Sequence, residues 1–127
     1  MPKQAVYPKG YVPSKNPLSP GIRSHHLLFV SGQVGRDSSG TVPNGVKAQT
    51  ELLLKNLQAV VEAAGATMND VVRCTCYLTD IADFPAFNEV YRTFFADPMP
   101  TRSTVEVSKL AGLGFVVEVD AVAEVEE

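Results

Sequence analysis

The sequence has 127 residues, of which 45% are hydrophobic and 20% are charged, and its formal net charge is −3. This length suits one domain with a substantial core, so we expect a single domain over residues 1–127. The sequence contains no Lys/Arg cluster and no apolar run of membrane-span length, so neither a nucleic acid nor a membrane is an expected partner.

The two cysteines, Cys74 and Cys76, lie two positions apart, which differs from the CxxC spacing of metal sites. On a strand they would face the same side, where such neighbours do not readily form a disulfide. We therefore expect buried, reduced thiols in a cytoplasmic protein and no metal site. The first residues, Met1–Gln4, lack the apolar segment of a secretory signal, which agrees with that location.

Residues 1 to about 20 contain five prolines, and this density predicts an extended arm or loop. Its strongest turn signal is Asn16–Gly21. Because the loop precedes the first predicted strand, it fits either the lining of a pocket or a surface wrap, and both alternatives stay open.

The first predicted strand is the apolar run His26–Val34. Ser31 and Gly32 end its apolar part, and glycine there allows a ligand or another strand to approach the backbone closely. The polar turn residues Arg36–Thr41 predict a hairpin or a short excursion.

Apolar residues then recur at three- and four-residue steps, which predicts a helix from about Gly45 to Ala64. Asn44 is the expected N-cap, and Gly65 the left-handed residue after the helix. The next run, Asp70–Leu78, is a predicted strand. The residues expected on one of its sides are Val72, Cys74, Cys76 and Leu78.

A second helix is predicted from about Phe84 to Phe95, with Asp83 as its cap. Its aromatic residues lie at helical spacing and predict a stripe that faces the core. Asn88 lies one position from Phe87, so it is either an exposed residue or part of a pocket rim.

Two prolines, Pro98 and Pro100, precede a β-like run that begins at Thr101. Arg102 therefore lies at the start of a strand, with stiff backbone on its N-terminal side. A planar group with five donors at a fixed position suits a carboxylate or a phosphate.

The last predicted strand is Phe115–Val122, in which Glu118 separates Val117 from Val119. An acid in a half-buried strand is unfavourable unless it is paired, neutral or used in chemistry. We infer that Arg102 and Glu118 serve one small-molecule site. The spacing fits equally well an ion pair or a solvated strand face.

The predicted order is strand, strand, helix, strand, helix, strand, strand, which indicates an α+β fold with both helices on one face of the sheet. The other face has no helix within the chain to cover its apolar residues. We therefore expect self-association.

The sequence resembles the Rid family, also called YjgF and known as endoribonuclease L-PSP, over nearly the whole chain. The most specific matches are Leu28–Gln33, Phe87–Tyr91, Pro100–Val107 and Val117–Ala121. Several blocks in the right order are more specific than a single motif. The resemblance implies a chorismate-mutase-like fold, a mixed β-sheet with two helices on one face, and a homotrimer with sites between subunits.

The resemblance also implies a deaminase that hydrolyses enamine and imine intermediates, such as 2-aminoacrylate, to 2-keto acids and ammonia. In the family pattern, Arg102 pairs with the substrate carboxylate and Glu118 positions or activates water. Gly32 contributes backbone contacts, and Ser31 and Asn88 line the pocket. This chemistry requires no metal and no organic cofactor, because the imine carbon is already electrophilic.

The chain departs from the family pattern at two positions: Leu18 replaces a tyrosine in the N-terminal loop, and Thr104 replaces a cysteine. Both are expected to line the substrate site, so they favour a changed substrate. The alternatives are a pathway-specific deaminase of an aminomuconate-like substrate and a non-enzymatic carboxylate-binding module. Ribonuclease activity ranks last, because the sequence offers no basic groove.

Overall fold

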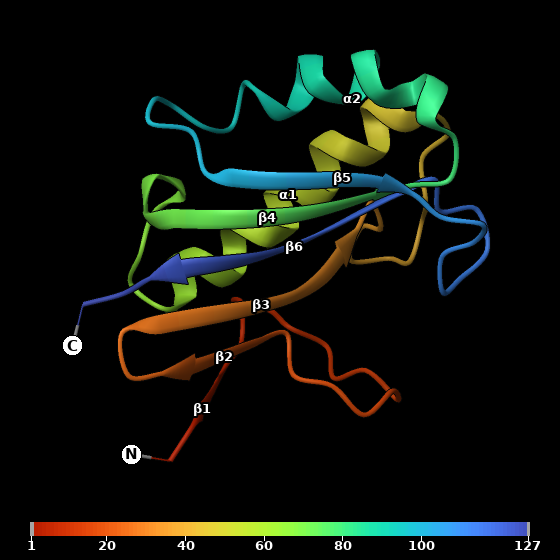
Figure 1. Ribbon diagram of the computed structural model, residues 1–127. Helices are drawn as coiled ribbons and strands as arrows, with labels where there is room; N and C mark the ends of the chain where they lie inside the picture. Colours follow the sequence, from red (N-terminus) through yellow and green to blue (C-terminus); the bar gives the residue numbers. More distant parts are fainter. Residues whose placement is uncertain (1, 127) are drawn as a thin grey trace.

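A mixed six-stranded sheet forms the frame of the computed structural model, which describes residues 2–126 (Figure 1). Its strands are β1 (Gln4–Val6), β2 (Gly21–Ser24), β3 (Leu27–Val34), β4 (Val71–Leu78), β5 (Thr101–Glu106) and β6 (Val117–Glu124). Their order across the sheet is β1-β2-β3-β6-β4-β5. β4 and β5 run parallel, and every other neighbouring pair is antiparallel.

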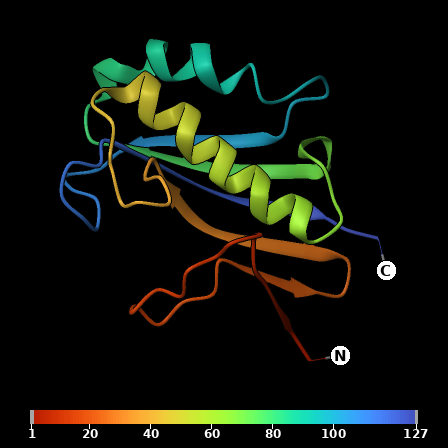
Figure 2. The same ribbon diagram turned by 180° about the vertical axis from the view of Figure 1, so that it is seen from behind.

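Both helices lie on one face of this sheet, as the sequence predicts. They are α1 (Val46–Ala63) and α2 (Phe84–Tyr91), and short 3-10 turns η1 (Met68–Asp70) and η2 (Ile81–Asp83) precede β4 and α2. The long helix α1 packs on β3 and β6, and α2 packs beside it. Figure 2 shows α1 crossing in front of the strands, whereas no helix covers the sheet face seen in Figure 1. We call this uncovered side the open face.

Helix α1 forms where the apolar spacing predicts it, and its apolar stripe is buried in the core. Its N-cap is Gly45, not Asn44, and no side chain caps the helix. The chain enters α1 with Gly45 at a φ of 93°. Glycine adopts this conformation more readily than asparagine does, and asparagine more readily than most other residues. Gly65 follows the helix with a φ of 84°, as predicted.

The buried polar residue Gln49 ties the start of α1 to the segment that leads into β6. Its Nε2 donates to the carbonyls of Pro43 (2.9 Å) and Gly114 (2.8 Å). Its Oε1 accepts from the backbone N–H of Val116 (2.9 Å). All the polar atoms of this side chain are therefore used on backbone groups of two loops.

A hairpin lies before β3, and the segment after β3 is a short excursion, which is one of the two predicted alternatives. β2 pairs with β3 through a tight turn in which His25 has a positive φ of 54°. No Gly or Asn marks this turn, so the sequence signal was weak. The segment Arg36–Thr41 contains no strand, because the Asp37 carboxylate accepts hydrogen bonds from the backbone N–H groups of Ser39 and Thr41 and closes a compact loop.

Two other boundaries differ from the prediction. Helix α2 ends at Tyr91 instead of Phe95. In β4 the pairing with β6 shifts between Val71 and Arg73, so Val71 is buried and Val72 is 44% exposed. Such a bulge inserts one residue and reverses the side that the preceding residue faces.

The two faces of the sheet differ in composition. The side chains on the helix side include the buried Leu28, Val30, Cys74, Cys76, Val119 and Ala121. Those on the open face include Leu27, Phe29, Tyr77, Val105, Glu118 and Asp120. Phe29 and Val105 are 45% and 44% exposed. An apolar surface of this kind is expected to meet a partner.

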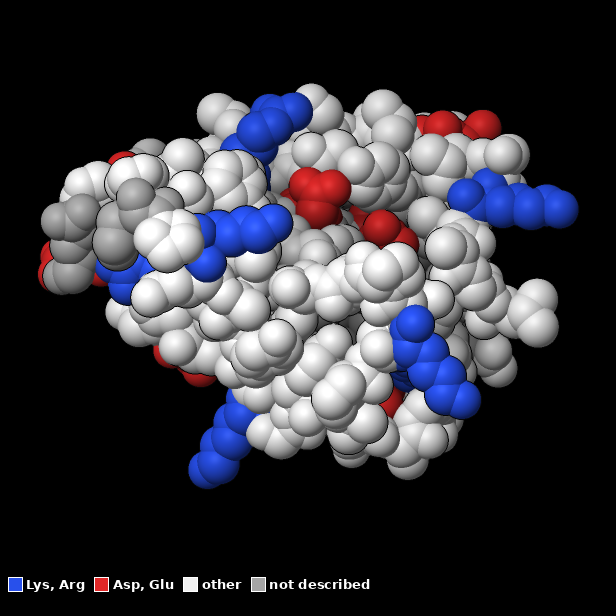
Figure 3. All heavy atoms as spheres, turned by 90° about the horizontal axis from the view of Figure 1, so that it is seen from below, with Lys and Arg blue, Asp and Glu red and all other residues white. Residues whose placement is uncertain are grey.

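No helix within residues 2–126 is long and apolar enough to cross a membrane. Figure 3 views the molecule from below the orientation of Figure 1, and its Lys and Arg side chains stand apart from one another, with acidic side chains near the middle. This face therefore lacks the continuous basic surface that nucleic acids select.

Candidate active site

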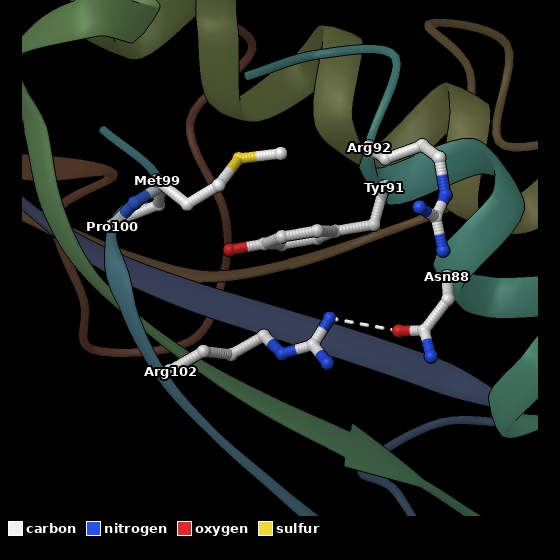
Figure 4. A pocket seen from close by; sticks show the side chains of 6 residues that line it. All are labelled: Asn88, Tyr91, Arg92, Met99, Pro100 and Arg102. Carbon is white, nitrogen blue, oxygen red and sulfur yellow. Dashed lines mark hydrogen bonds between the residues drawn. The ribbon is translucent and has the colours of Figure 1, made fainter. Parts of the chain in front are cut away.

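Arg102 lies on the edge strand β5, on the same side of the sheet as the helices. Its backbone neighbour on β4 is Cys74, whose side chain is fully buried under those helices. The Arg102 guanidinium reaches toward α2, where its Nη1 donates a 2.9 Å hydrogen bond to Oδ1 of Asn88 (Figure 4). Asn88 thus forms part of a pocket rim, which is one of its two predicted alternatives.

Three aromatic rings of the η2–α2 segment surround the same guanidinium. Its carbon lies 4.8 Å from the ring centroid of Tyr91, 5.3 Å from that of Phe84 and 5.8 Å from that of Phe87. Contacts of this type contribute about 0.5–2 kcal/mol each. Because positions three, four and seven residues apart share one side of a helix, the rings and Asn88 face β5 together.

A pocket of ≈ 290 Å³ opens beside this arginine (Figure 4). The lining residues are Asn88, Tyr91, Arg92, Met99, Pro100 and Arg102. This volume lies near the lower end of the range of about 300–1,000 Å³ for small-molecule sites. The pocket therefore suits a small metabolite.

Two buried hydroxyl groups near Arg102 have neighbouring thiols as their polar contacts. They belong to Tyr91 and Thr104, and both oxygens are buried. Their neighbours include the thiols of Cys74 and Cys76, and burial raises the pKa of Cys76 to about 12. Burial likewise raises the pKa of Cys74. Burial thus favours the protonated, less nucleophilic form of both thiols.

Glu118 lies on the open face, on the central strand β6. Gly32 lies directly beneath its carboxylate, at the point where the β3–β6 pairing is interrupted. A methyl group on Gly32 would collide with Oε2 of Glu118. Glycine at this position is therefore what allows the carboxylate to lie across β3.

The environment of Glu118 favours its protonated form. Burial, and then the negative charge of Asp120 two positions along the same strand face, raise the pKa of Glu118 above its ordinary value. The hydroxyl of Tyr77, on the neighbouring strand β4, donates a 3.0 Å hydrogen bond to Oδ2 of Asp120. Tyr77 therefore holds the carboxylate of Asp120, whose charge acts on Glu118.

Ser31 connects the N-terminal loop to the same region. Its hydroxyl donates to the carbonyl of Ser19 (2.6 Å), and its backbone N–H donates to the carbonyl of Pro20 (2.9 Å). The adjacent Leu18 is 53% exposed. Ser31 thus holds the loop that presents Leu18, and its hydroxyl proton is already engaged.

The seven predicted residues fall into two groups, which we call half-sites. The arginine half-site contains Asn88, Arg102 and Thr104, and the glutamate half-site contains Leu18, Ser31, Gly32 and Glu118. Within one chain, Arg102 and Thr104 lie on the helix side of the sheet, whereas Glu118 lies on the open face. The hypothesis that Arg102 and Glu118 serve one site therefore requires a second copy of the chain.

A profile of the family described as endoribonuclease L-PSP matches residues 11–125. The chain is 37% identical over 123 residues to a RutC family protein of Pyrococcus horikoshii, which covers 95% of this chain and 97% of that protein. It is 40% identical over 109 residues to the 2-iminobutanoate/2-iminopropanoate deaminase of mouse, which covers 84% of this chain and 80% of the relative. The chain belongs to the Rid/YjgF family.

The fold of this Rid/YjgF protein is close to solved structures of the family. The crystal structure of TdcF of E. coli with bound serine matches with a TM-score of 0.89 and 30% identity, over 97% of this chain and 99% of that one. The predicted α+β fold, with two helices on one face of a mixed sheet, is therefore confirmed.

Several residues around the two half-sites were missed as functional candidates. Tyr77 and Asp120 flank Glu118, and Tyr91 and Arg92 line the pocket beside Arg102. The signal for Asp120 was its alternation with Glu118 on one strand face, and the signal for Arg92 was its four-residue step from Asn88. Within residues 2–126, no group of three His, Cys, Asp or Glu side chains is placed to hold a metal ion.

Proposed function

We propose that this Rid/YjgF protein is a deaminase that hydrolyses small 2-imino acids, or their enamine tautomers, to 2-keto acids and ammonia. The observation that carries the proposal is the state of Arg102. An amide oxygen and three rings fix its guanidinium beside a pocket, and no carboxylate among the described residues pairs with it. A fixed cation of this kind suits the carboxylate that every substrate of this class carries.

The proposed active site forms between subunits of a homotrimer. Arg102 of one subunit binds the substrate carboxylate, while Glu118 of a second subunit faces the imine carbon. The exposed apolar residues of the open face, including Phe29 and Val105, support this assembly. A closed ring of three identical head-to-tail contacts completes three such sites.

In the proposed reaction a water oxygen attacks the imine carbon and forms a C–O bond. As the C–O bond forms, the π electrons of the C=N bond move to the nitrogen. The Glu118 carboxylate accepts a proton from this water and passes it to the nitrogen, which gives a carbinolamine with OH and NH2 on one carbon. Glu118 then accepts the hydroxyl proton and returns it to the nitrogen, so that the C–N bond breaks, ammonia leaves and the carbonyl of the keto acid forms. One water is consumed and one ammonia is released for each imine.

The environment of Glu118 suits both proton transfers. An acid with an ordinary pKa is a weak base and does not hold a proton near neutral pH. Burial raises the pKa of Glu118, which brings its proton affinity closer to that of the groups it serves. The repulsion from Asp120 acts in the same direction.

The named relatives support this chemistry. The mouse protein, 40% identical, is a 2-iminobutanoate/2-iminopropanoate deaminase. The TdcF structure contains bound serine, an amino acid whose carboxylate resembles that of the proposed substrates. Leu18 and Thr104 differ from the Tyr and Cys of the family pattern. The substrate side chain that this protein prefers therefore depends on its own pocket residues.

The test is a competition assay. An amino acid oxidase generates the imine, semicarbazide traps it, and the protein lowers the rate of semicarbazone formation if it hydrolyses the imine first. Imines derived from several amino acids cover the possible side chains. Acceleration of at least one hydrolysis is the expected result. If 2-keto acids bind but no imine is hydrolysed faster, the protein is a carboxylate-binding module instead.

A further inference from the structure

The pocket beside Arg102 contains a second guanidinium, that of Arg92. Figure 4 shows Arg92 and Arg102 extending toward Asn88 from two directions. Arg92 follows Asn88 by four residues, so both side chains lie on the same side of the α2 segment. Among the residues that line the pocket, these two arginines are the charged ones, and none is acidic.

The acid closest in sequence to Arg92 is already engaged. Glu89 forms an ion pair with Lys47 of α1, with its Oε2 2.6 Å from Nζ. Lys47 is the main cause of the lowered pKa of Glu89, and the charge of Arg92 lowers it less. Within residues 2–126, no hydrogen bond or ion pair holds the Arg92 guanidinium, which leaves its donors available to a ligand.

We propose that Arg92 makes this site selective for dianionic substrates, namely 2-imino dicarboxylates with four or five carbons. The inference rests on the proposed deaminase function and adds the substrate class. Arg102 binds the carboxylate next to the imine, and Arg92 binds the carboxylate at the other end of the carbon chain. Met99 and Pro100 provide the apolar wall along which the intervening carbons lie.

The size and charge of the pocket agree with this substrate class. A volume of ≈ 290 Å³ is small, yet it extends past Arg102 to a second cation. A monocarboxylate would leave the Arg92 end filled with water. Each guanidinium offers a planar pair of donors that matches one carboxylate, so a dianion can satisfy both arginines.

Arg92 also has a possible structural role, because it is the C-cap residue of α2. A cation at this position interacts favourably with the negative end of the helix dipole. This role predicts a lower melting temperature for an Arg92 variant and an equal effect on all substrates. Selectivity between substrates separates the two roles.

The experiment compares kcat/KM for the imines of glutamate and of 2-aminobutanoate in three proteins: wild type, Arg92→Gln and Arg92→Glu. The wild type is expected to prefer the dicarboxylate. Arg92→Gln is expected to lower kcat/KM for the dicarboxylate about fivefold, the scale of one partly exposed charge pair, and to lower it much less for the monocarboxylate, so that the ratio of the two values falls. Charge reversal in Arg92→Glu is expected to enlarge the loss for the dicarboxylate.

The matched control is Lys55→Gln, which removes one positive charge from the exposed side of α1. It is expected to leave the preference unchanged, which excludes an effect of net charge. The proposal is overturned if the wild type shows no preference for the dicarboxylate, or if Arg92→Gln lowers kcat/KM equally for both imines.

Calorimetric binding of two stable keto acids, 2-oxoglutarate and 2-oxobutanoate, keeps this inference separate from the deaminase proposal. If no imine is hydrolysed, the proposed function fails, and binding then decides the role of Arg92. Tighter binding of 2-oxoglutarate that Arg92→Gln abolishes supports the dianion site. Equal binding of the two keto acids overturns it.

Discussion

Arg102 and Glu118 lie on opposite faces of the same sheet. Arg102 pairs along the sheet with Cys74, whose side chain is buried under the helices, whereas Glu118 pairs with Tyr77 on the open face. The whole thickness of the sheet therefore separates their side chains. If both act on one substrate, they act from different subunits.

Mixed oligomers test this arrangement directly. We expect Arg102→Ala and Glu118→Gln to be inactive when each is assembled alone. In a trimer that contains both, one of the three interfaces brings an intact Arg102 to an intact Glu118. Random mixing at equal amounts is therefore expected to restore about a quarter of wild-type turnover.

Two measurements accompany the mixing experiment. Light scattering is expected to give three times the 13.7 kDa mass of one chain for the wild type and for both variants. Different affinity tags on the two variants establish that mixed trimers form. If both variants are inactive alone, mixed trimers with no more turnover than their parents would show that the two residues act within one subunit.

Glu118→Gln separates catalysis from folding. Turnover is expected to fall about a hundredfold or more, the scale of a general acid–base group, while the binding of 2-keto acids is retained. Because the folded state favours protonated Glu118, its contribution to stability decreases as pH rises from the ordinary pKa of 4.5 through the raised value. Glutamine avoids this loss, so the melting temperature at neutral pH should equal or exceed that of the wild type.

The control for this variant is Glu124→Gln, on the same face of β6 and exposed. Its turnover should match the wild type. Wild-type turnover in Glu118→Gln would remove Glu118 from the mechanism, whereas a lowered melting temperature would assign it a role in the fold or the trimer.

The pH dependence of kcat/KM should report the charge of Asp120. Activity is expected to decline as pH falls through the pKa of Glu118, since the base must be ionised to accept a proton. Asp120→Asn removes the second cause of the raised pKa and leaves burial, the larger one, in place. The acid limb of the profile should therefore move to lower pH. An unmoved limb would mean that Asp120 does not act on Glu118.

Arg102→Lys is expected to be nearly as damaging as Arg102→Ala. Lysine keeps the charge but loses the planar donor pair and the flat contact with the three rings. The loss in kcat/KM should correspond to about 2–4 kcal/mol in both variants. Arg36→Lys, at an exposed arginine after β3, should have wild-type kinetics. Unchanged kinetics in Arg102→Lys would make the arginine structural.

Gln49→Leu should destabilise the fold without a direct effect on the chemistry. Leucine has a similar size but leaves two carbonyls and one N–H without their partners. The expected loss in the free energy of unfolding is roughly 3–5 kcal/mol, measured by urea unfolding at one fixed protein concentration. Gln58→Leu, on a less buried side of α1, should cost far less. Equal stabilities of these two variants would contradict the role of Gln49.

Local patterns were sufficient for the main elements of the fold. The apolar spacing over residues 46–63 predicts α1, because one stripe must face the core for the helix to be stable. The aromatic spacing from Phe84 to Tyr91 similarly predicts α2 and the side that it buries. The predictions failed where the signal was not local. His25 forms a turn without a glycine, and the bulge between Val71 and Arg73 turns Val71 toward the core in place of Val72.

The sequence by itself determined which residues are candidates for chemistry. Arg102 follows two prolines at the start of a strand, and Glu118 interrupts an apolar run, so both stand out by residue type and position. The alternation of side chains within β6 also places Glu118 and Asp120 on one face. These conclusions depend only on the chain near each residue.

The tertiary structure alone decided which of these residues can meet. Arg102 and Asn88 come together because α2 lies over the edge strand β5, and Glu118 approaches Gly32 because β6 lies between β3 and β4. Strand order and the side that each strand presents depend on pairings between distant segments. A local pattern carries no information on these pairings, and so the separation of Arg102 from Glu118 could not be read from the sequence.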